Sequence, residues 1–462
     1  MTDKILPIHG TVPLAARWEP WMQELLSNPE QVRALTQEFG SPVNVLDASP
    51  LPRNAAELID AGTSRGVNTK VFFARKANKA LTFVDAARTA GHGIDVASRD
   101  ELLQVLDAGV EPERIIVSAA IKTDELLRIA LDAGVVISCD SRAELERIGR
   151  LNSSSLRDGM PSRARLAPRL APDPSKLPPT RFGELLGQWK DAQWPEGVEA
   201  VGVHVHLHGY AEADRRLALG EAISLVDHLR AQGQPTKFID IGGGVPMSYL
   251  EDPAQWEHYQ KRIQAQRDGT GEPFTWKSDP LSNTYPFWQT PTRGEWLGQL
   301  LDGDTPEHGT TKEALRQRDI ALHLEPGRSL LDGCGIILTE VSFLKSRSDG
   351  LPLIGVAMNR TQCRTAADDL LLDPALVPTA GDVEREPRTG FMVGAYCIED
   401  EVILRRKLDF PDGVAVGDTI AIPNTAGYFM HILESASHQI PLAKNIRRNS
   451  AQEWVLDAID VR

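Results

Sequence analysis

The stretch VFFARKA (71–77) sets the pattern for most of the chain. Val71 to Ala74 are apolar, as in a buried strand, and stretches at helical spacing such as RDELLQVLDAG (99–109) and SRAELERIGRL (141–151) come later. The seven further strand-like runs are GIDVAS (93–98), RIIVSAA (114–120), VVISCD (135–140), RLAPRLA (165–171), VGVHVHL (201–207), KFIDIGGG (237–244) and IALHLEPG (320–327). Eight strands alternating with helices predict a (β/α)8 barrel of the TIM type. The alternative, an open doubly wound sheet, is disfavoured by this number and by the absence of GxGxxG after the first run.

The pattern changes after about residue 330. Short strand-like runs without helices follow: GIILTEVSFLKSR (335–347), PLIGVAM (352–358), TGFMVGAYC (389–397), VILRRKL (402–408) and DTIAIPN (418–424). We therefore expect a barrel over 45–330 and a C-terminal β-barrel or β-sandwich domain over 331–462, with residues 1–44 packing on the latter. A long aromatic-rich insertion is expected at about 250–318, either with a functional role or as a cover for the core or a subunit contact.

Composition limits the classes of partner. The chain has 462 residues, a hydrophobic content of 41% and a formal net charge of −14, which disfavours nucleic acid and anionic membranes as main partners. No secretory signal or long apolar run is visible, so we expect a cytoplasmic protein. The four cysteines are scattered without CxxC spacing, and no metal site is predicted.

Polar residues mark the ends of several predicted strands. A lysine at Lys76 loses hydration, which lowers the pKa of an amine, so it is either a surface lysine with a buried stem or a Schiff-base nucleophile. In a barrel of this type the active site lies at the C-terminal ends of the strands. Those ends carry Lys76, Asp95, His206, the glycines Gly242, Gly243 and Gly244, and the pair Glu325 and Arg328.

Each of these groups has a use for one ligand, pyridoxal 5′-phosphate (PLP). Lys76 supplies the amine that the aldehyde needs, and the imidazole of His206 can stack on the ring. The glycine run leaves N–H groups free to approach a phosphate, for which Arg328 offers a fixed fork. A carboxylate at Glu325 keeps the pyridine nitrogen protonated, which makes the ring a strong electron sink.

The motifs closely resemble those of the fold-type III PLP-dependent decarboxylases, the group of diaminopimelate, ornithine and arginine decarboxylases. Within that group the overall pattern is most similar to the Y4yA-like branch. The resemblance runs from SPVNVLDASPLPRNAAEL (41–58) to AGYFMHILES (426–435). It implies an alanine racemase-like barrel and an amino-acid substrate. FARKAN makes Lys76 the Schiff-base lysine, and GIDVASRDEL places Asp95 and Glu101 near the cofactor. His206 takes the ring-stacking role, FIDIGGGVP is the phosphate loop, and EPGR gives Glu325 and Arg328 their roles at the pyridine nitrogen and the phosphate.

The C-terminal half of the resemblance implies a shared site. AGYF is similar to the family's GAY, whose tyrosine binds phosphate, which points to Tyr428. GAYCIED is similar to a segment whose reactive cysteine reaches the partner subunit's site, which makes Cys397 the expected proton donor after CO2 loss. The family's active site forms across a head-to-tail homodimer, so a homodimer is expected here.

Departures from the family pattern bear on the substrate. The family's HIGS is HLHG here, so Gly209 replaces a phosphate-binding serine and only its N–H remains. Ile398 follows the cysteine where diaminopimelate decarboxylases carry a glutamate, and DLLLDPALVP (369–378) lacks their arginine and tyrosine. We therefore expect a substrate other than meso-diaminopimelate. Candidate substrate residues are Arg360 and Arg364, which equally fit a solvated basic turn, together with Glu399 and Asp400.

Two alternatives remain. An amino-acid racemase on the same barrel would place an arginine against the pyridine nitrogen, whereas Glu325 favours decarboxylation. A non-catalytic regulator related to decarboxylases would not need to retain Lys76, His206 and Cys397. It would also be colourless.

Overall fold

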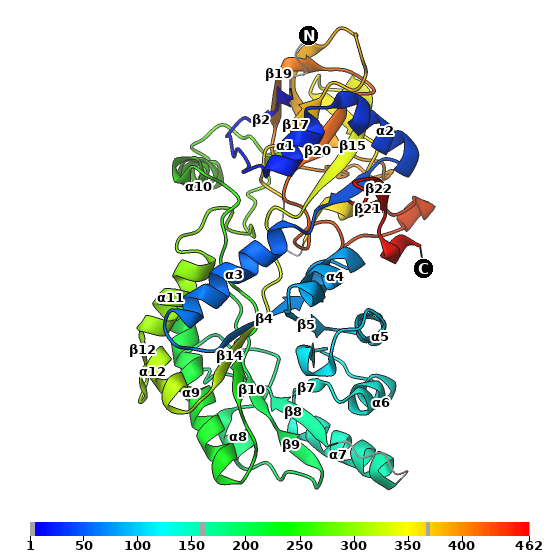
Figure 1. The fold of residues 1–462 in the computed structure, drawn as a ribbon. Helices are drawn as coiled ribbons and strands as arrows, with labels where there is room; N and C mark the ends of the chain where they lie inside the picture. The colour runs from blue at the N-terminus through cyan, green and yellow to red at the C-terminus, as the bar shows by residue number, and fades with distance from the viewer. Residues whose placement is uncertain (1–4, 158–162, 366–369, 462) are drawn as a thin grey trace.

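The computed structural model describes residues 5–157, 163–365 and 370–461. Figure 1 shows two lobes, with the parallel strands and their helices in the lower one. The upper lobe is built from the other sheet, and both chain ends lie on it. No helix among the described residues is both long and apolar enough to cross a membrane.

The lower lobe is a closed barrel of parallel strands. Its strands are β4 (Thr69–Ala74), β5 (Gly93–Val96), β6 (Ile115–Val117), β7 (Val136–Cys139), β8 (Ala164–Pro168), β9 (Val198–Ala200), β10 (Gly202–His204), β11 (Phe238–Asp240) and β14 (Ala321–Leu324). They pair in the order β10-β11-β14-β4-β5-β6-β7-β8-β9. Only Val201 separates β9 from β10, so these two segments form one barrel strand. The N–H of Leu170 donates to the carbonyl of His204 at 2.8 Å, which closes the ring. The predicted (β/α)8 fold is confirmed.

Helices cover the barrel's outer face. They are α3 (Pro50–Thr63), α4 (Leu81–Thr89), α5 (Arg99–Asp107), α6 (Asp124–Ala133), α7 (Arg142–Arg157), α8 (Leu186–Lys190), α9 (Glu212–Ala231), α11 (Arg293–Asp302) and α12 (Thr311–Gln317). Helix α11 packs against α3 and α9, as an outer helix between β11 and β14 does. The expected insertion at 250–318 therefore contains part of the barrel's own outer layer. Its extra part includes α10 (Pro253–Arg267), which lies to one side of the two lobes (Figure 1).

The second sheet joins both ends of the chain. It contains β1 (Leu6–Pro7), β2 (His9–Gly10), β3 (Val43–Leu46), β15 (Gly335–Ser346), β16 (Pro352–Val356), β17 (Ala375–Val377), β18 (Glu386–Val393), β19 (Leu408–Val414), β20 (Thr419–Ile422), β21 (Lys444–Arg448) and β22 (Trp454–Leu456). Strand β1 pairs with β17, β2 with β19, and β3 with both β15 and β21. Helices α1 (Pro20–Leu26) and α2 (Pro29–Phe39) pack on the same sheet. These pairings support the division that we propose, with residues 1–44 belonging to the β domain.

One expected strand is wrong. VILRRKL (402–408) is irregular up to Lys407, and the regular strand β19 begins only at Leu408. The reason lies in its arginines. Arg406 is fully buried and its Nη2 donates to Asp373 Oδ1 at 2.7 Å, while Arg405 pairs with Asp279 of the insertion. The backbone of this segment also bonds to the insertion, since the N–H of Lys407 donates to the carbonyl of Phe274 at 2.8 Å, so only an isolated bridge forms there.

Candidate functional site

A cavity of about 560 Å³ opens at the C-terminal ends of the barrel strands. Eight of the predicted site residues line it: Lys76, His206, Gly209, Gly243, Gly244, Glu325, Arg328 and Tyr428. Each of the first seven follows the end of a barrel strand, whereas Tyr428 comes from the β domain. The N–H of Tyr428 donates to the carbonyl of Ala77 at 2.8 Å, which fixes that segment beside the lysine. The cavity is therefore built by both domains.

Lys76 lies in a short turn directly after β4. Its Nζ donates to Asp95 Oδ2 at 3.1 Å, and the hydroxyl of Ser118 donates to the other oxygen of Asp95. Burial alone would lower the pKa of Lys76, as expected from the sequence. That expectation is wrong for the site as a whole, because the carboxylates of Asp95 and Glu325 outweigh burial and raise the pKa above its ordinary value.

Glu325 is the acid at the floor of the cavity. Its side chain is fully buried, and neither carboxylate oxygen has a hydrogen-bond partner by distance and angle within the described chain. Burial raises the pKa of Glu325, and burial together with Glu325 raises the pKa of Asp240, so the two carboxyl groups do not both ionise readily. A buried carboxyl group without partners is costly unless a ligand atom pairs with it.

Two imidazoles stand beside this acid. His206 Nδ1 and His204 Nε2 each lie 3.8 Å from Glu325 Oε2. Burial is the main cause that lowers the pKa of both histidines well below the usual range, so both are neutral at pH 7. The three groups could together hold a cation, since their ligand atoms lie within 4.8 Å of one another. His206 also accepts the N–H of Gly243 at 3.4 Å, which places its ring against the glycine loop.

The glycine loop approaches the neighbouring backbone too closely for side chains. A Cβ on Gly244, whose φ is +71°, would lie 2.6 Å from the carbonyl oxygen of Gly209. The N–H groups of Gly209, Gly244 and Arg328 have no hydrogen-bond acceptor among the described residues, although all three residues line the cavity. Unpaired amides from separate loops around one hollow form an anion-binding concavity. Gly242 belongs to the same loop, but its N–H donates a hydrogen bond to Asp240 Oδ1 at 2.8 Å.

Arg328 lies above aromatic rings at the edge of the cavity. Its guanidinium carbon is 4.0 Å from the ring centroid of Tyr285 and 5.2 Å from that of Tyr428. Its Nη1 donates to the carbonyl of Gly427 at 3.3 Å. The position of this planar cation is thus fixed next to the unpaired amides. Glu101, by contrast, does not line the cavity. It accepts the N–H of Ala97 at 2.6 Å and so holds the turn after β5.

The remaining predicted residues lie elsewhere. Cys397 and Glu399 are exposed in the turn after β18 and do not line the Lys76 cavity. Arg360, Arg364 and Asp400 line a different cavity of about 430 Å³, together with Trp276, Lys277, Asp279 and Arg405. There Asp400 accepts hydrogen bonds from Trp276 Nε1 at 3.0 Å and Lys277 Nζ at 2.6 Å. The extra part of the insertion therefore contacts the turn that carries Cys397.

Sequence reasoning missed several residues of the Lys76 cavity, among them Ser118 and Arg169. Ser118 and Arg169 follow the ends of β6 and β8 and line the cavity, and Arg169 lies 4.1 Å from the ring centroid of Phe182. The rule that selected Lys76 and His206, a polar residue at the C-terminal end of a barrel strand, applies to both. Their runs, RIIVSAA and RLAPRLA, were used only to count strands.

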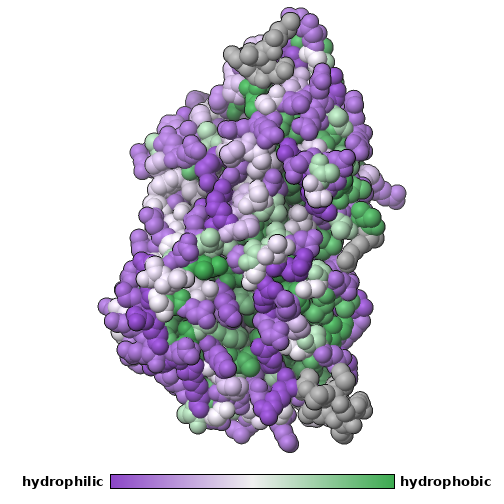
Figure 2. Space-filling model, viewed as in Figure 1, coloured by the Kyte–Doolittle hydropathy of each residue, from purple (hydrophilic) through white to green (hydrophobic). Residues whose placement is uncertain are grey.

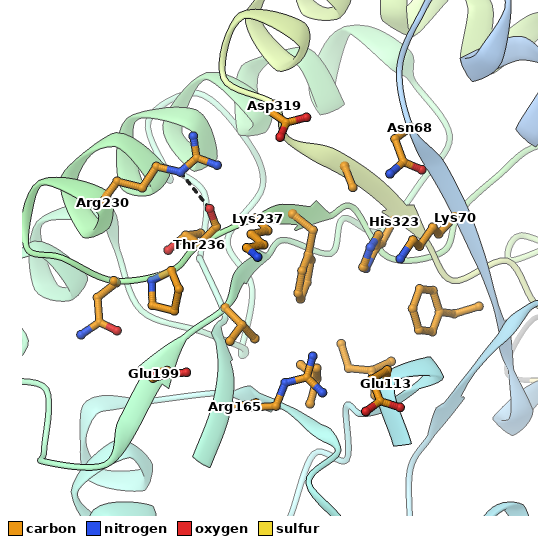
Figure 3. Close-up of a pocket in the computed structure, with 18 of the residues that line it drawn as sticks. Asn68, Lys70, Glu113, Arg165, Glu199, Arg230, Thr236, Lys237, Asp319 and His323 are labelled. Atoms are coloured by element: carbon orange, nitrogen blue, oxygen red, sulfur yellow. Dashed lines mark hydrogen bonds between the residues drawn. The ribbon is translucent and has the colours of Figure 1, made fainter. Parts of the chain in front are cut away.

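A larger cavity, of about 900 Å³, lies at the opposite end of the barrel (Figure 3). Its basic side chains are exposed, bonded to main-chain carbonyls or, for Arg318, paired with Asp227. Arg230 Nε donates to the carbonyl of Thr236 at 2.8 Å, and Lys70 and Lys237 are exposed. Several apolar side chains form its wall, including Phe72 and Phe238. Hydrophobic surface also gathers over the barrel lobe in the view of Figure 2. None of the predicted site residues lines this cavity.

The Lys76 cavity fits PLP. Lys76 offers an amine to the aldehyde, and the buried Glu325 offers an acid to the pyridine nitrogen. The neutral imidazole of His206 suits the ring face, and the unpaired amides beside Arg328 suit the phosphate. Three comparisons agree with this fit. The family described as "Pyridoxal-dependent decarboxylase, pyridoxal binding domain" matches residues 56–275.

The sequence relatives span nearly the whole chain. The uncharacterised protein y4yA of Sinorhizobium fredii is 31% identical over 419 residues, which are 87% of this chain and 86% of the relative. The diaminopimelate decarboxylase of Pseudomonas aeruginosa is 25% identical over 426 residues, 88% of this chain and 87% of that enzyme.

The fold is also found in solved structures. Diaminopimelate decarboxylase from M. jannaschii in complex with L-lysine superimposes with a TM-score of 0.69 at 20% identity, covering 92% of this chain and 90% of that one. SrLDC in complex with PLP and cadaverine gives a TM-score of 0.63 at 19% identity, covering 91% and 93%. The expected fold and cofactor are thereby confirmed, and the chain belongs to the fold-type III PLP-dependent amino-acid decarboxylases.

Proposed function

We propose that this protein decarboxylates an amino acid other than meso-diaminopimelate and binds PLP covalently through Lys76. The observation that carries the proposal is the pairing of two groups in one cavity. Lys76 Nζ lies beside Asp95 at 3.1 Å, and the buried Glu325 accepts no hydrogen bond of normal geometry on either carboxylate oxygen within the described chain. The amine then suits the aldehyde of the cofactor, and the acid suits its pyridine nitrogen.

The bound cofactor supplies an electron sink for the electron pair that is released when the Cα–carboxylate bond breaks. The chain's own groups prepare for this. Lys76 Nζ must lose a proton before it can attach to the aldehyde, and Asp95 Oδ2 is the adjacent acceptor. Glu325 holds a proton at the pyridine nitrogen, in a site without water access to its oxygens. His206, neutral and fixed by Gly243, offers a flat uncharged face.

Protonation of Cα after loss of CO2 needs a proton donor. We propose Cys397 for this role, acting from a second copy of the chain in a homodimer. Its exposure on the β domain, outside its own Lys76 cavity, is what an acid delivered to a partner's site requires. The proposal thus makes the homodimer a condition of activity.

The proposal that meso-diaminopimelate is not the substrate rests on two positions. The charged groups that would bind its distal end are missing there, or the side chain is already paired within the protein. Ile398 is exposed and has no charge to offer a distal amine. Asp373 lies in the stretch where diaminopimelate decarboxylases bind the distal carboxylate. It is buried and forms a structural ion pair with Arg406. Arg360 and Arg364 are the proposed contacts for a substrate carboxylate, with Asp400 and Glu399 on the neighbouring turn. Because they do not line the Lys76 cavity of their own chain, they would act, like Cys397, from a second copy.

Borohydride reduction of the PLP-loaded protein followed by peptide mass spectrometry tests the covalent link. We expect the pyridoxyl mass on the peptide with Lys76, and none in Lys76→Ala. Lys70→Ala is the matched control, because Lys70 lies on the same strand at the opposite end of the barrel. A pyridoxyl group on another lysine would contradict the assignment.

A panel of amino acids with product mass spectrometry then tests the reaction. Loss of CO2 from one of them identifies the substrate. Inverted stereochemistry without loss of mass would instead show a racemase, and the absence of PLP binding would show a regulator.

A further inference from the structure

Arg215 is a buried cation behind the loops that face the anion-binding concavity. It lies in the first turn of α9 and is only 2% exposed. Its Nη2 lies within hydrogen-bond distance of three carbonyl oxygens, those of Gly209 at 3.0 Å, Gly243 at 2.9 Å and Gly244 at 3.1 Å. One guanidinium therefore connects the loop after β10 to the loop after β11.

The position of these carbonyls determines where the amides can point. Arg215 holds the carbonyls of Gly209 and Gly244 on the side of the loops away from the cavity. The N–H groups of the same two residues have no acceptor among the described residues, and both residues line the cavity. Gly244 adopts a positive φ, and a Cβ there would lie 2.2 Å from Arg215 Nη2, so the close approach of the guanidinium requires glycine.

The charge of Arg215 is not balanced by the chain. No carboxylate lies within 4.0 Å of its guanidinium in the described parts of the chain, and its Nε is buried without a partner. Burial lowers the pKa of Arg215 to about 10, which still leaves it charged at pH 7. A buried cation of this kind is unfavourable unless an anion lies close by.

Aromatic side chains of the insertion and its neighbouring helix support both arginines of this region. The guanidinium carbon of Arg215 lies 5.2 Å from the ring centroid of Trp296, and that of Arg328 lies 4.0 Å from Tyr285. Trp296 Nε1 also donates to the carbonyl of Tyr210 at 2.7 Å, directly after Gly209. Trp296 and Tyr285 are themselves buried, so each cation lies against a ring in surroundings of low polarity, which strengthens its field.

We propose that Arg215 is a positioning residue for the phosphate of the cofactor: it orients the unpaired amides of both loops and supplies a buried positive charge behind them. This takes the place of the hydroxyl contact that Gly209 cannot make. The inference rests on the proposed PLP-dependent function and deepens it. Since Arg215 does not line the cavity, it acts through the glycine loops and not by touching the ligand.

The test compares PLP with pyridoxal, which lacks the phosphate. Apoprotein is titrated with each, for wild type, Arg215→Met, Arg215→Lys and the control Arg216→Met. Arg216 is the next residue on α9 and lies 4.0 Å from Glu212, outside the loops. We expect Arg215→Met to weaken PLP binding at least tenfold and pyridoxal binding less than threefold. The PLP affinity of Arg215→Lys should lie between those of wild type and Arg215→Met. Arg216→Met should bind both ligands as wild type does.

Two results would overturn the inference. PLP affinity within threefold of wild type in Arg215→Met would show that the charge and the loop contacts are dispensable. Equal losses for PLP and pyridoxal would show a general structural role. If Arg215→Met does not fold, the same comparison of PLP affinity with pyridoxal affinity is made on Arg215→Lys. Inorganic phosphate then serves as a second probe. Phosphate should raise the Tm of wild-type apoprotein more than that of Arg215→Lys, and equal increases would contradict the inference. Failure of wild type to bind PLP at all would instead remove the proposed function itself.

Discussion

Lys76 Nζ and Asp95 Oδ2 lie 3.1 Å apart at the ends of neighbouring strands, and the register that pairs Ala74 with Asp95 brings them together. Strand pairing therefore places the amine beside its proton acceptor before any ligand binds. The same contact raises the pKa of Lys76, so attachment of the cofactor depends on removing a firmly held proton.

Asp95→Asn should lower the pKa of Lys76, because the amide cannot stabilise the ammonium group. We expect the pH at which apoprotein recombines with PLP at half its maximal rate to fall by about one unit or more. Stopped-flow absorbance over a range of pH measures this. Asp100→Asn, on the exposed start of α5, is the control and should leave the profile in place. An unshifted profile in Asp95→Asn would show that this carboxylate does not control the amine.

Co-expression of Lys76→Ala and Cys397→Ser chains should restore activity that neither variant has alone. In a mixed homodimer one of the two sites then combines an intact lysine with an intact cysteine, so random pairing gives roughly a quarter of wild-type activity. A CO2-release assay on the unselected mixture measures it, and mixed dimers purified through two different tags should reach roughly half of wild-type activity. If the mixed preparation is as inactive as its parents, Cys397 does not act across an interface.

Asp373→Ala should destabilise the β domain strongly. The pair of Asp373 with Arg406 is nearly fully buried, with exposed side-chain fractions of 4% and 1%, and Asp373 Oδ2 also accepts the N–H of Leu14. Removal of one partner leaves a buried charge, at a cost of about 3–5 kcal/mol in the free energy of unfolding.

Arg347→Ala breaks a pair with Asp349 on the surface and serves as the comparison. It should cost much less than Asp373→Ala, because both partners are exposed to solvent. Urea denaturation followed by circular dichroism measures both. Equal effects of the two substitutions would show that the Asp373 pair is not worth more than a surface contact.

The stability of the protein should depend on pH through His323. Its ring stacks on Phe238 at 4.2 Å between centroids, and burial, with a smaller effect of Lys70, lowers its pKa to about 3. Above the unfolded pKa of about 6.5 the histidine is neutral in both states and its contribution to stability is complete. As pH falls from 6.5 towards 3, the unfolded chain binds a proton that the folded chain refuses, and stability is lost by up to ~1.4 kcal/mol per unit.

His323→Gln should remove this part of the slope, whereas His258→Gln, at an exposed position on α10, should not. Free energies of unfolding at several pH values between 5 and 7 measure the difference. A variant slope equal to that of wild type would mean that His323 takes up its proton in the folded state.

The barrel was predictable because each strand has a compact apolar signature that does not depend on distant residues. KFIDIGGG and IALHLEPG each contain a barrel strand, β11 and β14, and the polar residues that follow them reach the cavity. Arg215 was not predictable in this way. Its partners lie 6, 28 and 29 residues away in the chain, and nothing in the helical pattern of α9 indicates that a buried arginine faces glycine carbonyls.

The sequence predicts a pKa of Lys76 below its ordinary value, and this prediction was wrong for a related reason. Burial is visible in the sequence, but the carboxylates of Asp95 and Glu325 reach the lysine only through barrel closure. The irregular segment before Leu408 shows the same limit, because the partners of Arg405 and Arg406 come from the insertion and from residue 373. Local sequence patterns predict helices and strands. The charged partners of a side chain depend on the tertiary fold, and those patterns do not show them.

The pairing of β3 with both β15 and β21 has a consequence for the order in which the protein can fold during synthesis. Val43 to Leu46 leave the ribosome long before their partner strand, Lys444 to Arg448. The barrel strands are complete long before that, so the barrel can form while the N-terminal strands still wait without neighbours. Because Tyr428 reaches the lysine only from the late domain, the cavity is completed last, and a chain released early would carry a formed barrel with an unfinished site.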